Sequence, residues 1–151
     1  MQDQVKALNE AGIAAAFINS SLSERAFHET VRKTRNGDYK ILYVAPERLV
    51  TEGFMELAKT IEISMVTVDE AHCISQWGQD FRPSYMNISQ FVDMLEKRPI
   101  VSAFTATATE NVREDIICTL GLQDPFVLVN GFDRENLFFQ VEKPKPSSAV
   151  Q

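Results

Sequence analysis

The chain has 151 residues, of which 44% are hydrophobic and 24% are charged, a composition typical of a globular domain with its own core. Its net charge of −6 argues against a domain that binds nucleic acid mainly by bulk electrostatic attraction. No apolar run is long enough to span a membrane and the N-terminus does not resemble a signal peptide, so we expect a cytosolic protein. Two cysteines are too few for a disulfide framework, and we expect reduced thiols.

Helices alternate with short apolar strands along the chain, which predicts an α/β domain with a mainly parallel sheet flanked by helices. The first elements are an amphipathic helix that ends at Gly12 and a strand over Ile13 to Ile18. Ser21 and Glu24 have the spacing of a capping box for the next helix, which ends at Gly37. The basic residues near the end of this helix favour a solvated helix terminus over a nucleic-acid contact.

The rest of the chain continues this alternation. Further strands are predicted at Ile41 to Val44, Met65 to Val68, Ile100 to Ala106 and Phe126 to Asn130. Pro46 can begin a helix after the first of these strands, a second helix is expected from about Ser84 to Lys97, and Thr109 can cap a third that ends at Gly121. Residues 140–151 contain two prolines and two serines, which indicates a linker or a frayed tail.

Polar residues at the ends of the predicted strands are the candidates for a functional site, because ligands of open parallel sheets bind at the carboxyl ends of the strands. Asp69 and Glu70 directly follow the strand Met65 to Val68. A nucleotide hydrolase needs such a pair, one carboxylate to hold Mg²⁺ and one to orient or deprotonate the attacking water. Both can reach one site only if the chain turns immediately after the strand. An acidic turn without function is the alternative.

Four motifs together resemble the RecQ family of DNA helicases, specifically the first of their two RecA-like motor domains. In chain order they are YVAPERL, DEAHCISQWGQDFRPSY, FTATAT and FDRENLFF. The resemblance covers residues 1–139 and implies a RecA-like fold. It also implies that Asp69, with Mg²⁺, and Glu70 are the catalytic carboxylates, and that His72 links them to a motif in which Thr105 and Thr107 contribute to the nucleotide site.

The aromatic residues after this acidic pair suggest a second role. Trp77, Phe81 and Tyr85, with Arg82, supply flat faces and a cation for stacking on single-stranded bases, although burial in the core is the alternative for Trp77 and Phe81. The resemblance implies that this loop couples DNA binding to ATP hydrolysis. It assigns that role to Ser75, Gln76, Trp77, Phe81 and Arg82, and it makes Pro46, Glu47 and Arg48 candidates for DNA contact. Gln79 stands where the family commonly has histidine, which argues against a charge switch at that position.

No glycine-rich P-loop followed by Lys-Ser or Lys-Thr occurs in the chain. The resemblance therefore implies a motor domain truncated at its N-terminus, within a parent that uses ATP and Mg²⁺, acts on single-stranded DNA and duplex junctions, and has a second RecA-like domain in cis. We expect the 151-residue chain alone to be inactive, to bind no cofactor tightly, and to self-associate through the incomplete sheet beside Met65 to Val68.

Two other hypotheses remain open from the residues. A RecA-like domain without a P-loop can serve as a non-catalytic interaction module for nucleic acid or protein. A metal-dependent hydrolase that uses Asp69, Glu70, His72 and Cys73 is a poorer interpretation, because these nearly consecutive residues converge on one ion only if the loop is contorted. The expected location of the parent is the bacterial cytosol or nucleoid.

Overall fold

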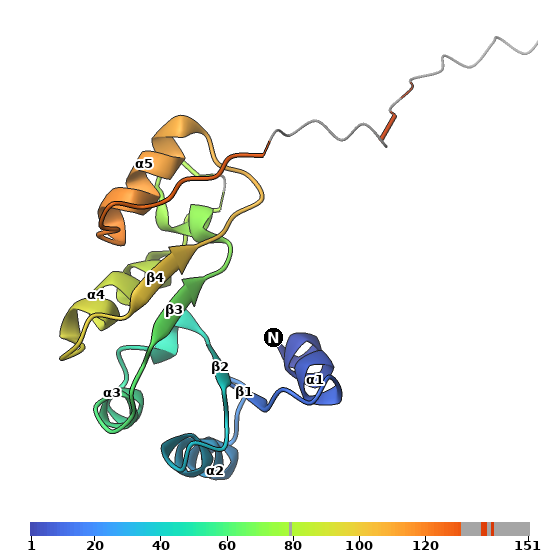
Figure 1. Ribbon diagram of the computed structural model, residues 1–151, viewed down its shortest axis with the longest axis vertical. Coiled ribbons are helices and arrows are strands. Elements are labelled where there is room, and N and C mark those ends of the chain that lie inside the picture. The colour runs from blue at the N-terminus through green and yellow to red at the C-terminus, as the bar shows by residue number, and fades with distance from the viewer. Residues whose placement is uncertain (79, 131–136, 139, 141–151) are drawn as a thin grey trace, which may run out of the picture.

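The structure is a computed structural model, and it describes residues 1–78, 80–130, 137, 138 and 140. Helices and strands alternate through the described part of the chain, as the sequence predicts (Figure 1). The helices are α1 (Gln2–Glu10), α2 (Glu24–Arg35), α3 (Glu52–Ala58), α4 (Met86–Met94) and α5 (Glu110–Thr119). The strands are β1 (Ala15–Ile18), β2 (Ile41–Val44), β3 (Met65–Val68) and β4 (Ile100–Ala103).

The four strands form two separate parallel pairs. β1 pairs with β2, with Ala15 opposite Ile41, and β3 pairs with β4, with Met65 opposite Ile100. The described strands therefore do not join into one sheet. In Figure 1 the pair formed by β3 and β4 is next to α4 and α5, and the pair formed by β1 and β2 is next to α1 and α2. The α/β class and the parallel pairing are confirmed.

A cleft of about 530 Å³ separates the two strand pairs. Its walls include Leu42 and Val44 of β2 and Met65 through Val68 of β3. A second cleft of about 560 Å³ lies between β4 and residues 125–130. The strand edges at both clefts carry no strand partner among the described residues. Among the described residues β3 therefore has an open edge at Met65 to Val68, where an incomplete sheet was expected.

One hydrophobic core supports the carboxyl end of β3. Val68 is buried there, and helices α3, α4 and α5 each contribute apolar side chains. The rings of Phe54 on α3 and Phe91 on α4 pack with their centroids 5.5 Å apart. Burial of this cluster holds the end of β3, and hence the residues that follow it, in a fixed position.

The caps predicted for α5 and α2 had different outcomes. Thr109 caps α5, with its hydroxyl oxygen accepting from the amide of Val112 at 3.4 Å, and Gly121 follows this helix with a φ of 57°. The predicted cap of α2 was wrong, because Ser23 accepts from the amide of Ala26 at 3.3 Å. The Ser21 hydroxyl instead donates to Asn19 Oδ1 at 2.8 Å.

The strand predicted at Phe126 to Asn130 is also wrong. These residues have no regular secondary structure, and Phe126 is 90% exposed. An extended apolar segment becomes a strand only when a neighbouring strand satisfies its backbone groups, and here it borders the second cleft instead. Other elements are shorter than predicted: β4 ends at Ala103, and Pro46 begins only a 3₁₀-helix, Pro46–Arg48.

In the part of the chain that the structure describes, no helix combines the length and the apolar character needed to cross a bilayer. The motif FDRENLFF falls mostly on residues outside the described ones, as does nearly all of the predicted tail, residues 140–151.

Candidate functional site

The chain turns sharply just after β3, as the acidic pair requires. Glu70 adopts a left-handed conformation with a φ of 49°, which is unusual for a residue with a side chain. After this turn Ala71 is buried in the core, and its amide donates to the carbonyl of Phe104 at 2.9 Å. The 3₁₀-helix Ala71–Ile74 begins at this point. The contact with the segment after β4 therefore holds the backbone in the conformation that exposes both carboxylates.

Both acidic side chains are exposed at the carboxyl end of β3. Asp69 Oδ1 accepts from the amide of Glu70 at 3.0 Å, and among the described residues Oδ2 makes no hydrogen bond. Glu70 Oε2 lies 3.3 Å from Nδ1 of His72. Exposed carboxylate oxygens are the protein ligands that Mg²⁺ prefers, so this donor set fits a magnesium ion that keeps part of its water shell.

His72 connects this turn to the residues after β4. Its Nδ1 lies 2.9 Å from the hydroxyl of Thr105, and that hydroxyl donates to the carbonyl of Thr107 at 3.2 Å. We assign a proton to Nδ1, because the Thr105 hydroxyl uses its own proton toward Thr107. The structure thus joins three of the predicted site residues in one hydrogen-bonded chain.

The segment from Ser75 to Arg82, which we call the aromatic-rich loop, follows the end of this 3₁₀-helix, and the structure describes its residues 75–78 and 80–82. The backbone amide of Arg82 donates to the carbonyl of Cys73 at 2.9 Å, which closes the base of the loop. Trp77 is 77% exposed and Phe81 is 36% exposed, so the alternative of a core aromatic is wrong for Trp77. Gln76 is also exposed. A large indole that faces solvent is available for stacking on a ligand.

Tyr85 differs from these two aromatics. It packs against the hydrophobic core, and its hydroxyl donates to the backbone carbonyl of Asp69 at 3.3 Å. Burial raises the pKa of this phenol. Tyr85 therefore connects the acidic turn to the core. Sequence reasoning missed this role because Trp77, Phe81 and Tyr85 look alike in the motif.

Ser75, the predicted coupling residue at the base of the loop, is buried and hydrogen-bonded. Ser75 is 1% exposed, and its hydroxyl donates to Oδ2 of Asp115 on α5 at 2.6 Å. In this conformation the Ser75 side chain has no access to DNA, so any part it takes in coupling is indirect. Asp115 was not predicted, although an acidic residue three positions after the buried Val112 is a signal that could have identified it.

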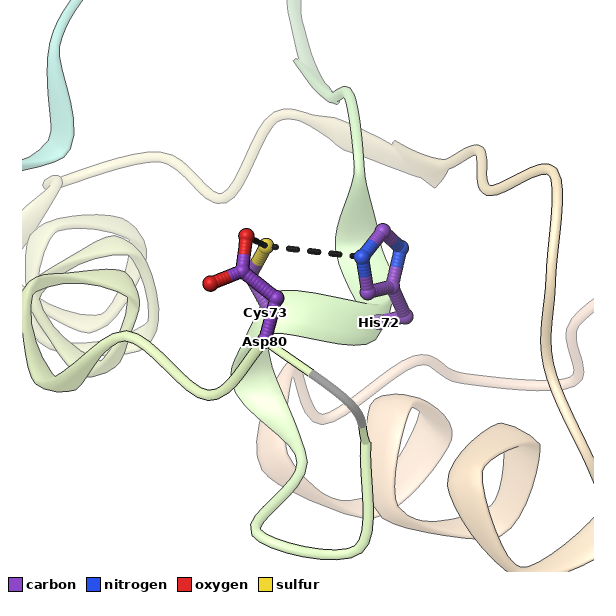
Figure 2. A group of neighbouring side chains, drawn as sticks. All are labelled: His72, Cys73 and Asp80. Carbon is purple, nitrogen blue, oxygen red and sulfur yellow. Dashed lines mark hydrogen bonds between the residues drawn. The ribbon is translucent and has the colours of Figure 1, made fainter.

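His72, Cys73 and Asp80 form a cluster whose potential ligand atoms all lie within 4.8 Å of one another (Figure 2). Asp80 Oδ2 also accepts from Nε of Arg82 at 3.1 Å, and this hydrogen bond lowers the pKa of Asp80. Burial raises the pKa of the Cys73 thiol. A protonated thiol and a carboxylate already paired with a fixed cation do not favour a metal ion. We interpret the cluster as a set of side-chain contacts that holds the two ends of the aromatic-rich loop together.

This geometry also bears on the metal-dependent hydrolase considered above. Asp69 and Glu70 do not belong to the cluster found among the described residues, so the four residues named for that hypothesis do not converge.

The 3₁₀-helix Pro46–Arg48 follows β2 on the other strand pair. Asn87 of α4 donates to the carbonyl of Pro46 at 3.3 Å, which ties this segment to the core. Glu47 is exposed, and it forms no ion pair with Arg48 in the part of the chain that the structure describes. Both side chains therefore remain candidates for an external contact.

Comparison with known proteins defines the class of this chain. The sequence model of the family described as DEAD/DEAH box helicase matches residues 1–115, which is more than half of the chain. The chain therefore belongs to the DEAD/DEAH box helicase family. Within that family its similarity is to RecQ helicases, which confirms the resemblance that its motifs indicate.

Three relatives illustrate this similarity. The chain is 48% identical over 143 residues to the ATP-dependent DNA helicase RecQ of Bacillus subtilis (strain 168), covering 95% of the chain and 24% of that protein. It is 43% identical over 147 residues to the ATP-dependent DNA helicase RecQ of Pasteurella multocida (strain Pm70), covering 97% and 23%. It is 36% identical over 143 residues to the bifunctional 3'-5' exonuclease/ATP-dependent helicase WRN of Mus musculus, covering 93% and 10%. The chain thus spans at most a quarter of the length of these three relatives.

Proposed function

We propose that this chain is part of an ATP-dependent 3′-to-5′ DNA helicase that couples ATP hydrolysis to DNA unwinding in repair and recombination. The observation that carries the proposal is the exposed Trp77, which sits on a loop that begins at the 3₁₀-helix bearing His72. Trp77 is only a few residues after Asp69 and Glu70, so a DNA base stacked on its indole would bind at a loop that is connected directly to the carboxylates. Similarity to RecQ helicases supports the same assignment.

In this proposal the exposed acidic pair performs the hydrolytic chemistry. Asp69 would hold Mg²⁺ through water, and the bound ion would offset negative charge on the phosphate oxygens. Glu70 would accept a proton from the attacking water, because its carboxylate is exposed beside His72. Thr105 and Thr107 would move when the nucleotide is hydrolysed, and their hydrogen bonds would transmit this movement to His72.

The DNA side of the proposal uses the aromatic-rich loop. Trp77 and Phe81 would stack on single-stranded bases, and Arg82 would contact phosphate or base from its partly exposed position. Gln76 would contribute a polar contact to the same strand, and Ser75 would act through the loop backbone. Pro46, Glu47 and Arg48 would line the path of the DNA backbone.

The partners of the whole protein are part of the same proposal. They are single-stranded DNA and duplex junctions, ATP with Mg²⁺, and a second RecA-like domain in cis. We also propose a bacterial cytosolic or nucleoid location for the whole protein. Self-association of the 151-residue chain would use the open strand edge of β3 at the first cleft.

Replacement of Trp77 tests this function directly. In a helicase that contains this chain, Trp77→Ala should leave basal ATP hydrolysis within about twofold of the unmutated rate, because Trp77 makes no side-chain contact with the acidic pair among the described residues. Stimulation by single-stranded DNA should fall about tenfold or more, the equivalent of one or two lost stacking interactions.

Met94→Ala is a suitable control, because Met94 is an exposed apolar residue on α4 remote from the loop. The measurement is ATP turnover with and without single-stranded DNA. A Trp77→Ala enzyme that DNA stimulates as well as the unmutated enzyme would refute the coupling role.

A further inference from the structure

A buried hydroxyl lies at the base of the exposed aromatic-rich loop. The Ser75 hydroxyl accepts from the backbone amide of Trp77 at 3.1 Å and donates to Oδ2 of Asp115 at 2.6 Å. It therefore links the backbone of the exposed Trp77 to a carboxylate that is 40 positions away from Ser75 in sequence. A hydrogen bond to an ionised acceptor is about twice as strong as one between neutral groups.

Asp115 belongs to a rigid element. Thr109 caps α5 at its start, and Val112 and Ile116 on the same helix are buried in the core. The indole of Trp77, by contrast, is 77% exposed, and the described contacts of the loop with the rest of the chain are at its base. Asp115 therefore connects the base of an exposed loop to a helix that the core holds in place.

The same stretch of chain also reaches the acidic turn. Thr105, which contacts His72, lies shortly before α5 in the sequence, and Asp115 contacts Ser75 from within α5. The segment from Thr105 through α5 thus contacts the DEAH motif at one point and the base of the loop at another. A shift of this segment would therefore change the contacts both at His72 and at Ser75.

We propose that Asp115 is a positioning residue that sets the place of Trp77 through the Ser75 hydroxyl, so that α5 and the aromatic-rich loop move together. The inference rests on the proposed function for its consequence in DNA coupling. Its structural content, that Asp115 orders Trp77, is independent of DNA and of ATP.

Trp77 is the sole tryptophan among the 151 residues, so its fluorescence reports the order of the loop directly. Asp115→Ala leaves the buried Ser75 hydroxyl without its acceptor, and the equilibrium between ordered and open loop should shift about tenfold or more toward the open form. We expect stronger acrylamide quenching of Trp77 and lower fluorescence anisotropy. Asp115→Asn keeps an acceptor oxygen at the same place and should recover most of the order.

Glu114→Ala is the matched control, because it removes an adjacent exposed carboxylate from the same helix. Unchanged quenching in both Asp115 variants, or an equal change in Glu114→Ala, would overturn the positioning role. A double-mutant cycle with Ser75→Ala adds a second criterion, since the two changes should be strongly non-additive if they act through one hydrogen bond. Additive effects on quenching would also overturn it.

In a helicase that contains this chain, Asp115→Ala should reduce DNA-stimulated ATP hydrolysis and leave the basal rate within about twofold, since Asp115 contacts neither carboxylate of the acidic pair. The failure of each hypothesis is separable. Normal DNA stimulation in Trp77→Ala refutes the proposed function of the loop, whereas normal Trp77 quenching in Asp115→Ala refutes the positioning role.

Discussion

Gly78 lies where the aromatic-rich loop passes closest to the 3₁₀-helix Ala71–Ile74. A Cβ atom at this position would be 2.6 Å from the carbonyl oxygen of His72 and 3.1 Å from that of Ser75. Both are backbone atoms, so they cannot move aside without displacing the chain. Gly78→Ala should therefore lower the free energy of unfolding by about 1–3 kcal/mol, the usual cost of overpacking, and disturb the position of Trp77.

Gly53→Ala provides the control for this prediction. Gly53 lies within α3, and the atoms nearest to an added Cβ belong to the side chain of Phe27, at 3.3 Å. The ring can adjust, and alanine gains about 1 kcal/mol of helix propensity over glycine, so little net loss is expected. Urea unfolding of both variants makes the comparison. Equal stability of Gly78→Ala and the unmutated chain would mean that the loop does not pass this close.

At the scale of elements, α2 shows how a short sequence can offer two candidate caps. Ser23 accepts from the amide of Ala26, whereas Ser21 donates to Asn19. Ser23→Ala should therefore cost about 0.5–1 kcal/mol of unfolding free energy, the lower part of the range for N-caps because the site is exposed. Ser21→Ala should change stability by less than about 0.5 kcal/mol. Chemical denaturation distinguishes the two, and a larger loss in Ser21→Ala would restore the cap that the sequence predicted.

At the scale of the whole molecule, the charge distribution limits affinity for DNA. The net charge is −6, and the basic residues near the end of α2 are partly engaged, with Lys33 3.0 Å from Glu29. The 151-residue chain should bind single-stranded DNA weakly, and log K should fall with log salt with a slope of magnitude about 2, as for about three neutralised phosphates. Fluorescence anisotropy across a salt series measures both quantities. Submicromolar affinity at physiological salt would contradict this prediction.

Nucleotide binding also depends on the composition of the whole chain. In the proposed function Asp69 and Glu70 would act on Mg²⁺ that phosphates already hold, and the 151 residues contain no P-loop whose amides and lysine could bind those phosphates. Exposed carboxylates repel an anionic phosphate tail. Calorimetry with Mg²⁺ and a non-hydrolysable ATP analogue should therefore detect no binding in the low micromolar range. A dissociation constant in that range would show that the chain binds phosphate by another route.

Much of the fold could be predicted because its signals are local. β2 and β3 have their predicted bounds, and α5 has the predicted cap at Thr109 and the predicted stop at Gly121. Caps, glycine stops and apolar periodicity depend on residues within a few positions of each other. The segment Phe126 to Asn130 shows where this reasoning ends, since its apolar pattern suits a strand but a strand also requires a partner.

The sequence by itself determined the family and singled out the acidic pair as the candidate site, because the DEAH motif and its neighbours are contiguous and specific. Only the tertiary structure decided which aromatics face solvent, with Trp77 exposed and Tyr85 packed beneath the turn. It also decided that Ser75 contacts Asp115, 40 positions away, and it supplied the atoms of the link between His72 and Thr105 that the family resemblance implies. The physical reason is that these contacts depend on how the core places β4 and α5 against the DEAH motif, and no local pattern encodes a distance through space.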